Sequence, residues 1–277
     1  MLSLATRTIS QPLRPILRLN LVTALSPRHE SGGPVLVTGA ARGLGAAIAI
    51  ALAKNGIEPI LLGRNNHSLE ATAFVVSEYL GRQSRSISAD VSNWLELKNS
   101  INAVLVPDET FSGLVNNAGI IEPISRIEDC DPAAWAHCIQ VNLIGSFNVL
   151  RACLPKIAAG GRVANISSGA AEAEHAGWSA YAASKAGLER LSATLANERP
   201  DLGVYAVRPG VTDTGMQAEI RASTVDNAIR RLKKDDLQSV DIPAMAIASL
   251  FCASQLGNFG RVVESKSIPI FRYNYSQ

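Results

Sequence analysis

The sequence predicts an α/β fold, a single doubly wound domain with a mostly parallel sheet of seven strands. Two patterns predict it. From residue 34 onward, short apolar runs alternate with longer stretches of helical periodicity, and this order calls for a parallel sheet with helices on both faces. The apolar runs also lack the polar alternation of a strand that has one face in water. We therefore expect strands that are buried on both faces.

The elements follow one another without an internal repeat or a linker that would divide the body. Strands are expected at residues 35–38, 59–63, 86–90, 113–119, 162–168, 204–209 and 261–264. Helices are expected at residues 43–56, near 66–80, from 93, from about 132 to 157, around 181–185 and at about 242–254. Gly56 is the expected C-terminal cap of the first helix.

The composition, 47% hydrophobic and 18% charged residues, is typical of a globular protein. Beyond residue 30 the basic and acidic groups nearly balance, so we expect no nucleic-acid partner. The longest strongly apolar run, residues 46–53, is far shorter than the roughly 20 residues that span a bilayer, which argues against a membrane partner. The four cysteines include no CxxC pair and no histidines at zinc spacing. They predict buried free thiols and no metal site.

Residues 1–32 are expected to be an N-terminal extension, and residues 33–277 the folded domain. The extension contains four arginines and no acidic residue before Glu30. This composition is typical of a mitochondrial transit segment. A disordered tail on a cytoplasmic protein is the alternative, so both mitochondrial and cytoplasmic locations remain open.

The stretch TGAARGLG, residues 38–45, lies between the first strand and the first helix. In such a turn, Gly39 permits a tight bend, Gly43 lets the backbone approach a pyrophosphate, and Gly45 lets the helix pack closely. Free N–H groups at the start of the helix then bind the phosphates. The turn predicts a dinucleotide site.

This GxxxGxG spacing resembles the short-chain dehydrogenase/reductase family, and other motifs follow in the family's order from about Pro34 to Met216. They are Asp90 and Val91 after the third strand, NNAG at residues 116–119, Asn142, Ser168, YAASK at residues 181–185, and PGVTDT at residues 209–214. The resemblance implies a Rossmann-type fold and an NAD(P)-dependent oxidoreductase acting on CH–OH or C=O groups.

The resemblance also implies roles for individual residues. Ser168, Tyr181, Lys185 and Asn142 would be catalytic, with Asn142 holding a water that connects Lys185 to solvent. The cofactor would be bound by the glycine-rich turn, by residues after the strands and by the catalytic pair. These residues are Gly39, Arg42, Gly43, Leu44, Gly45, Arg64, Asp90, Val91, Asn117, Tyr181, Lys185, Thr212 and Thr214.

The end of the second strand indicates which dinucleotide is bound. A carboxylate there would hydrogen-bond the ribose 2′-hydroxyl of NAD. This chain has Gly63 at that place, followed by Arg64, and Arg42 lies inside the glycine-rich turn. Guanidinium groups bind phosphate oxygens in a bidentate manner, so the two arginines favour NADP(H).

Tyr181 and Lys185 are four residues apart and project from one face of a helix. An ammonium about 4 Å from a phenol, at an effective dielectric constant near 20, favours the phenolate by about 4 kcal/mol, or roughly three pKa units. We therefore expect the pKa of Tyr181 to lie close to neutrality, so that the phenol can protonate a reduced carbonyl. Ser168 would orient that carbonyl; alternation in a strand turns its neighbour Ser167 to the opposite face.

Residues 117–123, 177–187 and 207–221 are similar to the sepiapterin and benzil reductase-like branch of the family. This similarity implies an NADPH-dependent carbonyl reductase for a ketone or α-dicarbonyl substrate, with a lid at about residues 213–240. His175 and Trp178 are candidate substrate contacts. An NAD-dependent alcohol dehydrogenase and a non-catalytic nucleotide sensor are the alternatives. The family also implies a homodimer or homotetramer, although residues 260–269 lack the family's usual DGG.

Overall fold

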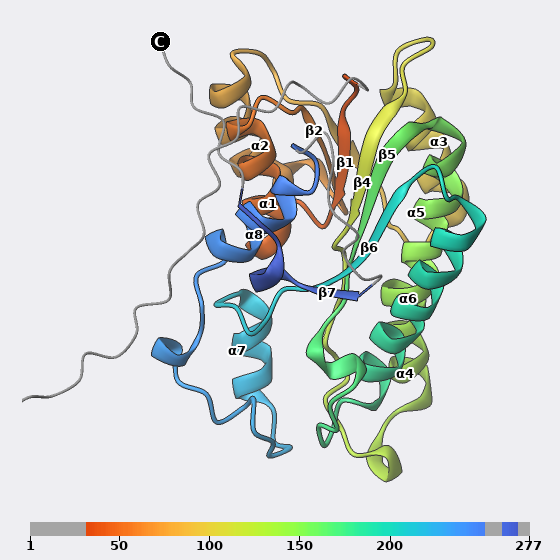
Figure 1. Ribbon diagram of the computed structural model, residues 1–277. Helices are drawn as coiled ribbons and strands as arrows, with labels where there is room; N and C mark the ends of the chain where they lie inside the picture. The colour runs from red at the N-terminus through yellow and green to blue at the C-terminus, as the bar shows by residue number, and fades with distance from the viewer. Residues whose placement is uncertain (1–31, 253–261, 271–277) are drawn as a thin grey trace, which may run out of the picture.

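The computed structural model describes residues 32–252 and 262–270. Seven strands form one sheet in the order β3-β2-β1-β4-β5-β6-β7 (Figure 1). Every neighbouring pair is parallel, so the predicted α/β fold is confirmed. The strands are β1 (Val35–Thr38), β2 (Pro59–Gly63), β3 (Ser86–Ser88), β4 (Phe111–Asn116), β5 (Ile157–Ile166), β6 (Gly203–Arg208) and β7 (Val262–Glu264).

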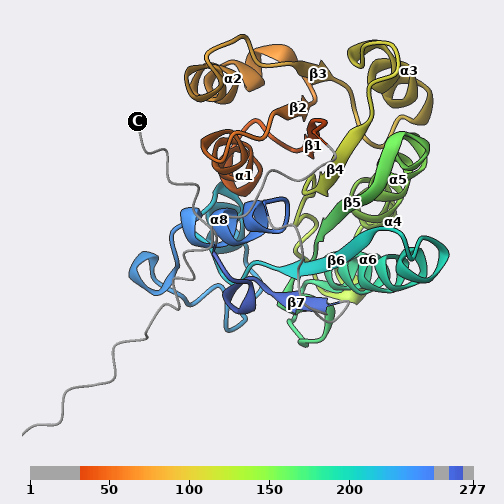
Figure 2. The same ribbon diagram turned by 45° about the horizontal axis from the view of Figure 1, so that its top comes forward.

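Helices cover both faces of this sheet (Figure 2). One layer contains α1 (Gly43–Lys54), α2 (Asn66–Leu80) and α8 (Asp241–Ser249), and the other contains α3 (Trp94–Val104), α4 (Pro132–Ile139), α5 (Gly145–Cys153) and α6 (Ser179–Glu198). Each layer has its own apolar core. Val35 and Val37 of β1 pack in the first core, and Leu36 packs in the second, because successive side chains of a strand point to opposite faces.

The prediction of one long helix from about 132 to 157 is wrong. The structure has α4, a π-helical turn (Gln140–Ile144), α5 and a short 3₁₀ turn (Leu154–Lys156). Pro155 lacks an N–H group and lies in the 3₁₀ turn, where the helix ends. Ile157 then begins β5, which ends at Ile166, before Ser167 and Ser168.

Other boundaries differ by a few residues, as is usual for element ends. α2 begins after Asn65, whose side chain accepts a hydrogen bond from the backbone of Ser68. The last helix ends at Ser249, and the remainder of its predicted range beyond residue 252 lies outside the described residues. Cys138 and Cys153 are buried free thiols as predicted, whereas Cys130 and Cys252 are only half-buried.

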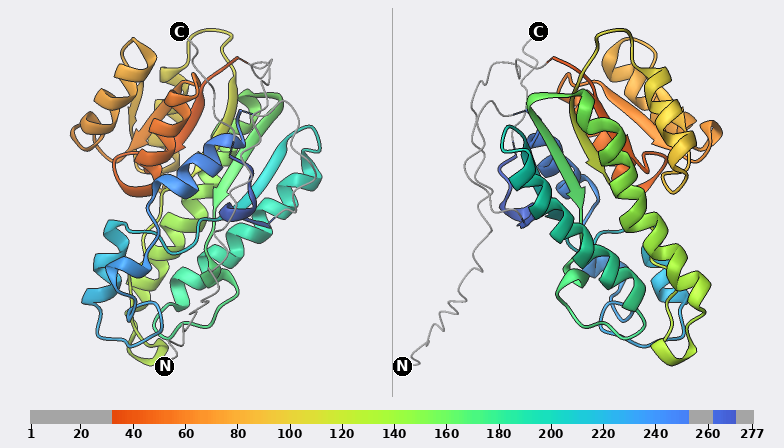
Figure 3. Two further views of the ribbon diagram at one scale, coloured as in Figure 1. Left: turned by 60° about the vertical axis from the view of Figure 1, so that its left-hand side comes forward. Right: turned by 90° about the vertical axis from the view of Figure 1, so that its right-hand side faces the viewer.

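α7 (Gly215–Ala222) lies beyond the carboxyl ends of the strands, on the side of the molecule where α4 and α6 begin (Figure 3). It belongs to the segment predicted as a lid. Within the described ranges, no helix has the length and apolarity to cross a membrane. Residues 1–31, which make up nearly all of the predicted N-terminal extension, lie outside the described residues.

Candidate active site

The glycine-rich turn is built directly onto the NNAG segment after β4. Gly39 has a φ of +65°, a conformation that favours glycine. A Cβ atom at Gly45 would lie 2.2 Å from the Gly39 carbonyl oxygen and 2.5 Å from Asn117 Nδ2. Asn117 Nδ2 in turn donates to the Thr38 carbonyl oxygen at 3.0 Å. A residue larger than glycine at position 45 would therefore clash with the turn and with Asn117. We had expected only that Gly45 lets the helix pack closely.

The start of α1 fits the pyrophosphate of a dinucleotide. Arg42 is the N-cap residue, and no side chain caps the helix, so the first N–H groups of the helix are free to bind an anion. Gly43, with a φ of +57°, lies next to Thr214, since a Cβ atom there would be 3.6 Å from Thr214 Cγ2. Leu44 follows in the first turn and is buried.

Three predicted cofactor residues have local partners. Asp90 Oδ1 accepts hydrogen bonds from the backbone N–H and the hydroxyl of Ser92, at 2.8 and 2.6 Å. Val91 is buried, and its carbonyl oxygen accepts a hydrogen bond from Asn148 at 3.0 Å. Thr212 is buried and pairs in a parallel bridge with Gln238, which joins the two ends of the predicted lid.

The end of β2 leaves little space for a side chain at position 63. A Cβ atom at Gly63 would lie 3.0 Å from Leu69 Cδ2. Arg64 is exposed, and its backbone carbonyl oxygen accepts a hydrogen bond from Ser88. Arg42 is also exposed and pairs with Glu219 of α7, Nη2 to Oε1, at 3.7 Å. An exposed pair of this kind contributes about 1 kcal/mol at most, so it leaves Arg42 available to a phosphate.

The predicted catalytic residues come together where β5 ends against α6. Tyr181 and Lys185 are both buried on α6, and Lys185 Nζ lies 5.6 Å from the centre of the Tyr181 ring. The Ser168 hydroxyl lies close enough to the Tyr181 hydroxyl to favour the ionised form of the phenol. Ser167 instead donates to Glu189 at 2.7 Å. The two serine hydroxyls therefore have different partners, and only that of Ser168 contacts Tyr181.

The expectation of a nearly neutral pKa for Tyr181 is wrong for this structure. Burial raises the pKa of Tyr181 to about 12, although the nearby Ser168 hydroxyl acts in the opposite direction. Burial lowers the pKa of Lys185 to about 8. Lys185 Nζ donates to the carbonyl oxygen of Ile166 at 2.8 Å. At neutral pH this geometry therefore has a protonated phenol next to a charged ammonium, which is a proton donor rather than a base.

Asn142 lies in the π-helical turn and is fully buried. Its Oδ1 atom accepts from the Ile120 N–H at 2.8 Å, and its Nδ2 atom donates to the Ile120 carbonyl at 2.9 Å and to Ser184 at 3.0 Å. A Cβ atom at Gly119 would lie 3.2 Å from Asn142 Oδ1 and 3.5 Å from Lys185 Nζ. Asn142 and Lys185 therefore border the same glycine, and the water contact of Asn142 stays a prediction.

An apolar cluster surrounds Tyr181. Trp178 is buried, and its ring meets the Tyr181 ring edge-on with centroids 5.7 Å apart. His175 lies behind Trp178, at a centroid distance of 4.8 Å. Ile220 of α7 belongs to the same cluster, and Met216 packs against it. Trp178 thus contacts Tyr181 directly, whereas His175 reaches it only through Trp178.

Sequence reasoning missed Glu189 and Arg208. Arg208 Nε and Nη2 donate to the two carboxylate oxygens of Glu189 at 2.7 and 2.8 Å. A signal was present in the sequence, because Glu189 continues the four-residue spacing of Tyr181 and Lys185 along one helix face. Its partner on β6 could not be inferred from that spacing.

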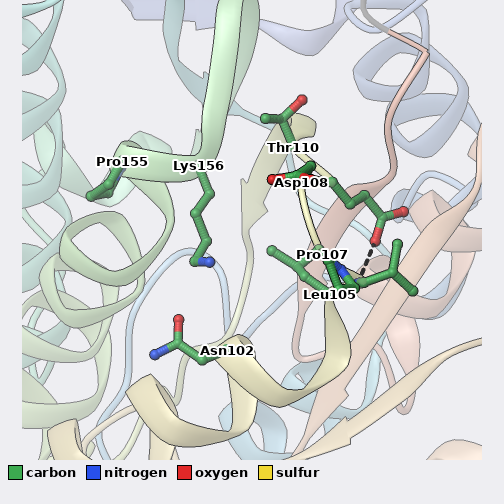
Figure 4. Close-up of a pocket in the computed structure, with 9 residues that line it drawn as sticks. Asn102, Leu105, Pro107, Asp108, Thr110, Pro155 and Lys156 are labelled. Carbon is green, nitrogen blue, oxygen red and sulfur yellow. Dashed lines mark hydrogen bonds between the residues drawn. The ribbon is translucent and has the colours of Figure 1, made fainter.

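A separate cavity lies at the other end of the sheet (Figure 4). It is lined by the loop after α3, with Leu105, Pro107 and Asp108, and by Pro155 and Lys156 before β5. None of the predicted site residues borders it. In open parallel sheets, ligands bind at the carboxyl ends of the strands, so this cavity is not the site of the chemistry.

The family model of the short chain dehydrogenases matches residues 34–224. The chain belongs to the short-chain dehydrogenase family. This membership confirms the predicted family and makes the chain an oxidoreductase of an NAD(P)-dependent class. The matched range contains the glycine-rich turn, the NNAG segment and the YAASK stretch.

Two curated relatives of this short-chain dehydrogenase have similar lengths. An uncharacterised oxidoreductase of Saccharomyces cerevisiae is 30% identical over 229 residues, covering 79% of this chain and 89% of the relative. A benzil reductase ((S)-benzoin forming) of Bacillus subtilis is 32% identical over 232 residues, covering 78% of this chain and 91% of the relative. The predicted similarity to benzil reductases is therefore confirmed.

Solved structures agree with this fold. The crystal structure of a short-chain dehydrogenase/reductase from Saccharomyces cerevisiae has a TM-score of 0.77 and 26% identity, and the match covers 86% of this chain and 99% of that one. A short-chain dehydrogenase from Shigella flexneri, crystallised in complex with NADP, has a TM-score of 0.74 and 26% identity, with 84% and 97% of the two chains covered.

Proposed function

We propose that this short-chain dehydrogenase is an NADPH-dependent carbonyl reductase that acts on a ketone or an α-dicarbonyl compound. The observation that carries the proposal is the buried pair on α6, in which Lys185 lies one helical turn from Tyr181 with Nζ 5.6 Å from the centre of its ring, and Ser168 lies close to the Tyr181 hydroxyl. A protonated phenol beside a buried cation is suited to supply a proton to a carbonyl oxygen as carbon is reduced.

The cofactor is held by the glycine-rich turn and by the segments around it. The N–H groups at the start of α1, which no side chain caps, would bind the pyrophosphate. Asp90 and Val91 would hold the adenine end of the cofactor, and Asn117, Thr212 and Thr214 would hold the remainder. When bound, the reduced nicotinamide supplies the hydride.

Three side chains act on the substrate. The hydroxyl of Ser168 donates a hydrogen bond to the substrate carbonyl oxygen and so orients it. Tyr181 gives its proton to the same oxygen. Lys185 stabilises the phenolate that remains, because a positive charge nearby offsets the cost of a buried anion. Asn142, which borders Gly119 beside Lys185, holds a water through which the proton is replaced.

The preference for NADPH rests on the end of β2 and on the glycine-rich turn. Gly63 stands where a carboxylate would favour NAD, contact with Leu69 leaves little space for a larger residue there, and Arg64, which follows, is exposed. Arg42 can leave its weak pair with Glu219 for the 2′-phosphate. The Shigella flexneri relative crystallised with NADP supports this choice.

The substrate class follows from the apolar cluster and the relatives. Trp178 and Ile220 are buried aromatic and aliphatic side chains in the same cluster as the proton donor Tyr181, and an apolar environment of this kind suits a substrate with apolar substituents on its carbonyl groups. The similarity to a benzil reductase supports an aromatic α-dicarbonyl. Residues 213–240, joined at their base by the pairing of Thr212 and Gln238, form the lid over this surface.

We also propose a homodimer or homotetramer. Ile144 and Phe147 are exposed apolar residues near and on α5, with 40% and 49% of their surface accessible, and a second copy of the chain would cover them. Light scattering on the purified protein tests this assembly. A mitochondrial location is proposed on the composition of residues 1–30 alone, and a fluorescent fusion of the full chain tests it.

The function is tested by NADPH oxidation with benzil, phenanthrenequinone, sepiapterin, a 3-oxoacyl thioester and a steroid ketone. We expect turnover of at least one dicarbonyl, with NADPH preferred to NADH. Turnover only of alcohols with NAD would instead support a dehydrogenase. No turnover of any compound with either cofactor would support a nucleotide sensor.

A further inference from the structure

Three consecutive residues at the end of β5 are each joined to α6 by a different side chain. Ile166 accepts a hydrogen bond from Lys185 through its carbonyl oxygen, at 2.8 Å. Ser167 donates to Glu189 at 2.7 Å, and the hydroxyl of Ser168 lies close to that of Tyr181. The helix residues are spaced by four, so they lie on one face of α6. The carboxylate of Glu189 is therefore the third side-chain group of α6 that contacts the segment carrying Ser168.

Glu189 also joins this segment to the end of β6. Arg208, the last residue of β6, binds both of its oxygens through Nε and Nη2. The two side chains are 13% and 9% exposed. Arg208 has a second partner in Glu172, at 2.7 Å, but that carboxylate is 73% exposed. One buried carboxylate thus links β5, α6 and the start of the loop that carries Thr212 and Thr214.

Stability alone does not account for such a pair. Removing two charges from water is costly, and apolar residues of similar volume often replace a buried ion pair without loss of stability. A bidentate arginine–carboxylate contact does, however, define geometry closely. Small displacements of a catalytic group lower rates strongly, about a hundredfold for 1 Å.

We propose that Glu189 is a positioning residue that sets the hydroxyl of Ser168 against Tyr181, acting through Ser167 and Arg208. The proposal rests on the proposed reductase function, because Ser168 and Tyr181 are the groups that it positions. Glu189 is not among the residues proposed to contact the substrate or the cofactor.

The test replaces Glu189 with glutamine, which keeps the shape but leaves a single acceptor oxygen and turns an NH₂ group toward Arg208 or Ser167. We expect Glu189→Gln to lower kcat for carbonyl reduction at least tenfold, counted per NADPH-binding site, with the Kd for NADPH changed less than threefold. Ser167→Ala, a smaller change, is expected to lower kcat severalfold. Glu172→Gln is the matched control, since it removes the exposed partner of the same arginine, and should stay within twofold of the wild type.

Wild-type kcat per site in Glu189→Gln would overturn the proposal, and so would equal losses in Glu189→Gln and Glu172→Gln. The crystal structure of Glu189→Gln gives a readout that does not depend on turnover. We expect the distance between Ser168 Oγ and the Tyr181 hydroxyl to increase there, and an unchanged distance would refute the positioning role. If the wild-type protein reduces no carbonyl compound, the proposed function fails and this structural readout still decides the role of Glu189.

Discussion

Lys185 Nζ lies 5.6 Å from the centre of the Tyr181 ring and donates its hydrogen bond elsewhere, to the carbonyl oxygen of Ile166. In the proposed reaction the lysine would therefore act on the phenol through its charge. Since burial raises the pKa of Tyr181 and lowers that of Lys185, the pair is neutral phenol and charged ammonium over the physiological range. This state favours reduction, in which the phenol gives up its proton.

Tyr181→Phe should reduce carbonyl turnover by at least a thousandfold, because the only proton donor proposed for the substrate oxygen is removed. Binding of NADPH, followed by quenching of protein fluorescence, should change little. Tyr79→Phe, which alters an exposed tyrosine on α2, is the control and should retain full activity. Comparable turnover in Tyr181→Phe would refute the assigned role.

The rate of reduction should fall as pH rises through about 8. Burial lowers the pKa of Lys185 to about 8, and above this pH the lysine loses the charge that stabilises the phenolate. The measurement is kcat between pH 6 and 10 with saturating NADPH and substrate. A rate that stays level to pH 10 would contradict the electrostatic role of the lysine.

The lowered pKa of Lys185 also predicts how the stability of the protein depends on pH. The pKa of Lys185 in the folded protein lies below its ordinary value of 10.5, so between about pH 8 and 10 the unfolded chain holds the proton that the folded protein has released. The free energy of unfolding contributed by this group must then rise with pH in that window. Urea unfolding should show the wild type gaining stability relative to Lys185→Met from pH 8 to 10. A constant difference would count against the shift.

Arg64→Asp should weaken NADPH binding at least tenfold relative to NADH, because it replaces a phosphate-binding cation with an anion. The ratio of the two kcat/KM values measures the change. Arg151→Asp reverses an exposed charge on α5 and should leave the ratio as it is. An unchanged ratio in Arg64→Asp would mean that the 2′-phosphate is bound elsewhere.

Asn142→Ala should destabilise the protein by about 3 kcal/mol, because the buried Asn142 side chain loses its hydrogen bonds to the N–H and C=O groups of Ile120 and to Ser184. It should also lower kcat, since the π-helical turn beside Lys185 loses its link to the 119–120 segment. Chemical denaturation gives the first quantity. Asn102→Ala, an exposed change on α3, is the control, and an equal effect of both substitutions would contradict this account.

The alternation of strands with helices and the pairing of Tyr181 with Lys185 could be predicted, because alternating apolar runs and a four-residue spacing are local properties of the chain. The contact of Glu189 with Arg208 could not, since it joins α6 to β6 across a long stretch of sequence. The pKa of Tyr181 could not be predicted either, and the expectation from the sequence that it lies near neutrality was wrong. It depends on how completely Trp178, Ala170 and Ile220 cover the phenol, and packing of that kind is decided only in three dimensions.

Transfer of deuterium from NADPH labelled at C4 to benzil, followed by mass spectrometry of the product, tests the central claim most directly. Wild-type protein should place one deuterium on the new carbinol carbon and consume one NADPH for each benzoin formed, and Tyr181→Phe should form almost none. Labelled benzoin formed at the wild-type rate by Tyr181→Phe would contradict the claim that this phenol is the proton donor.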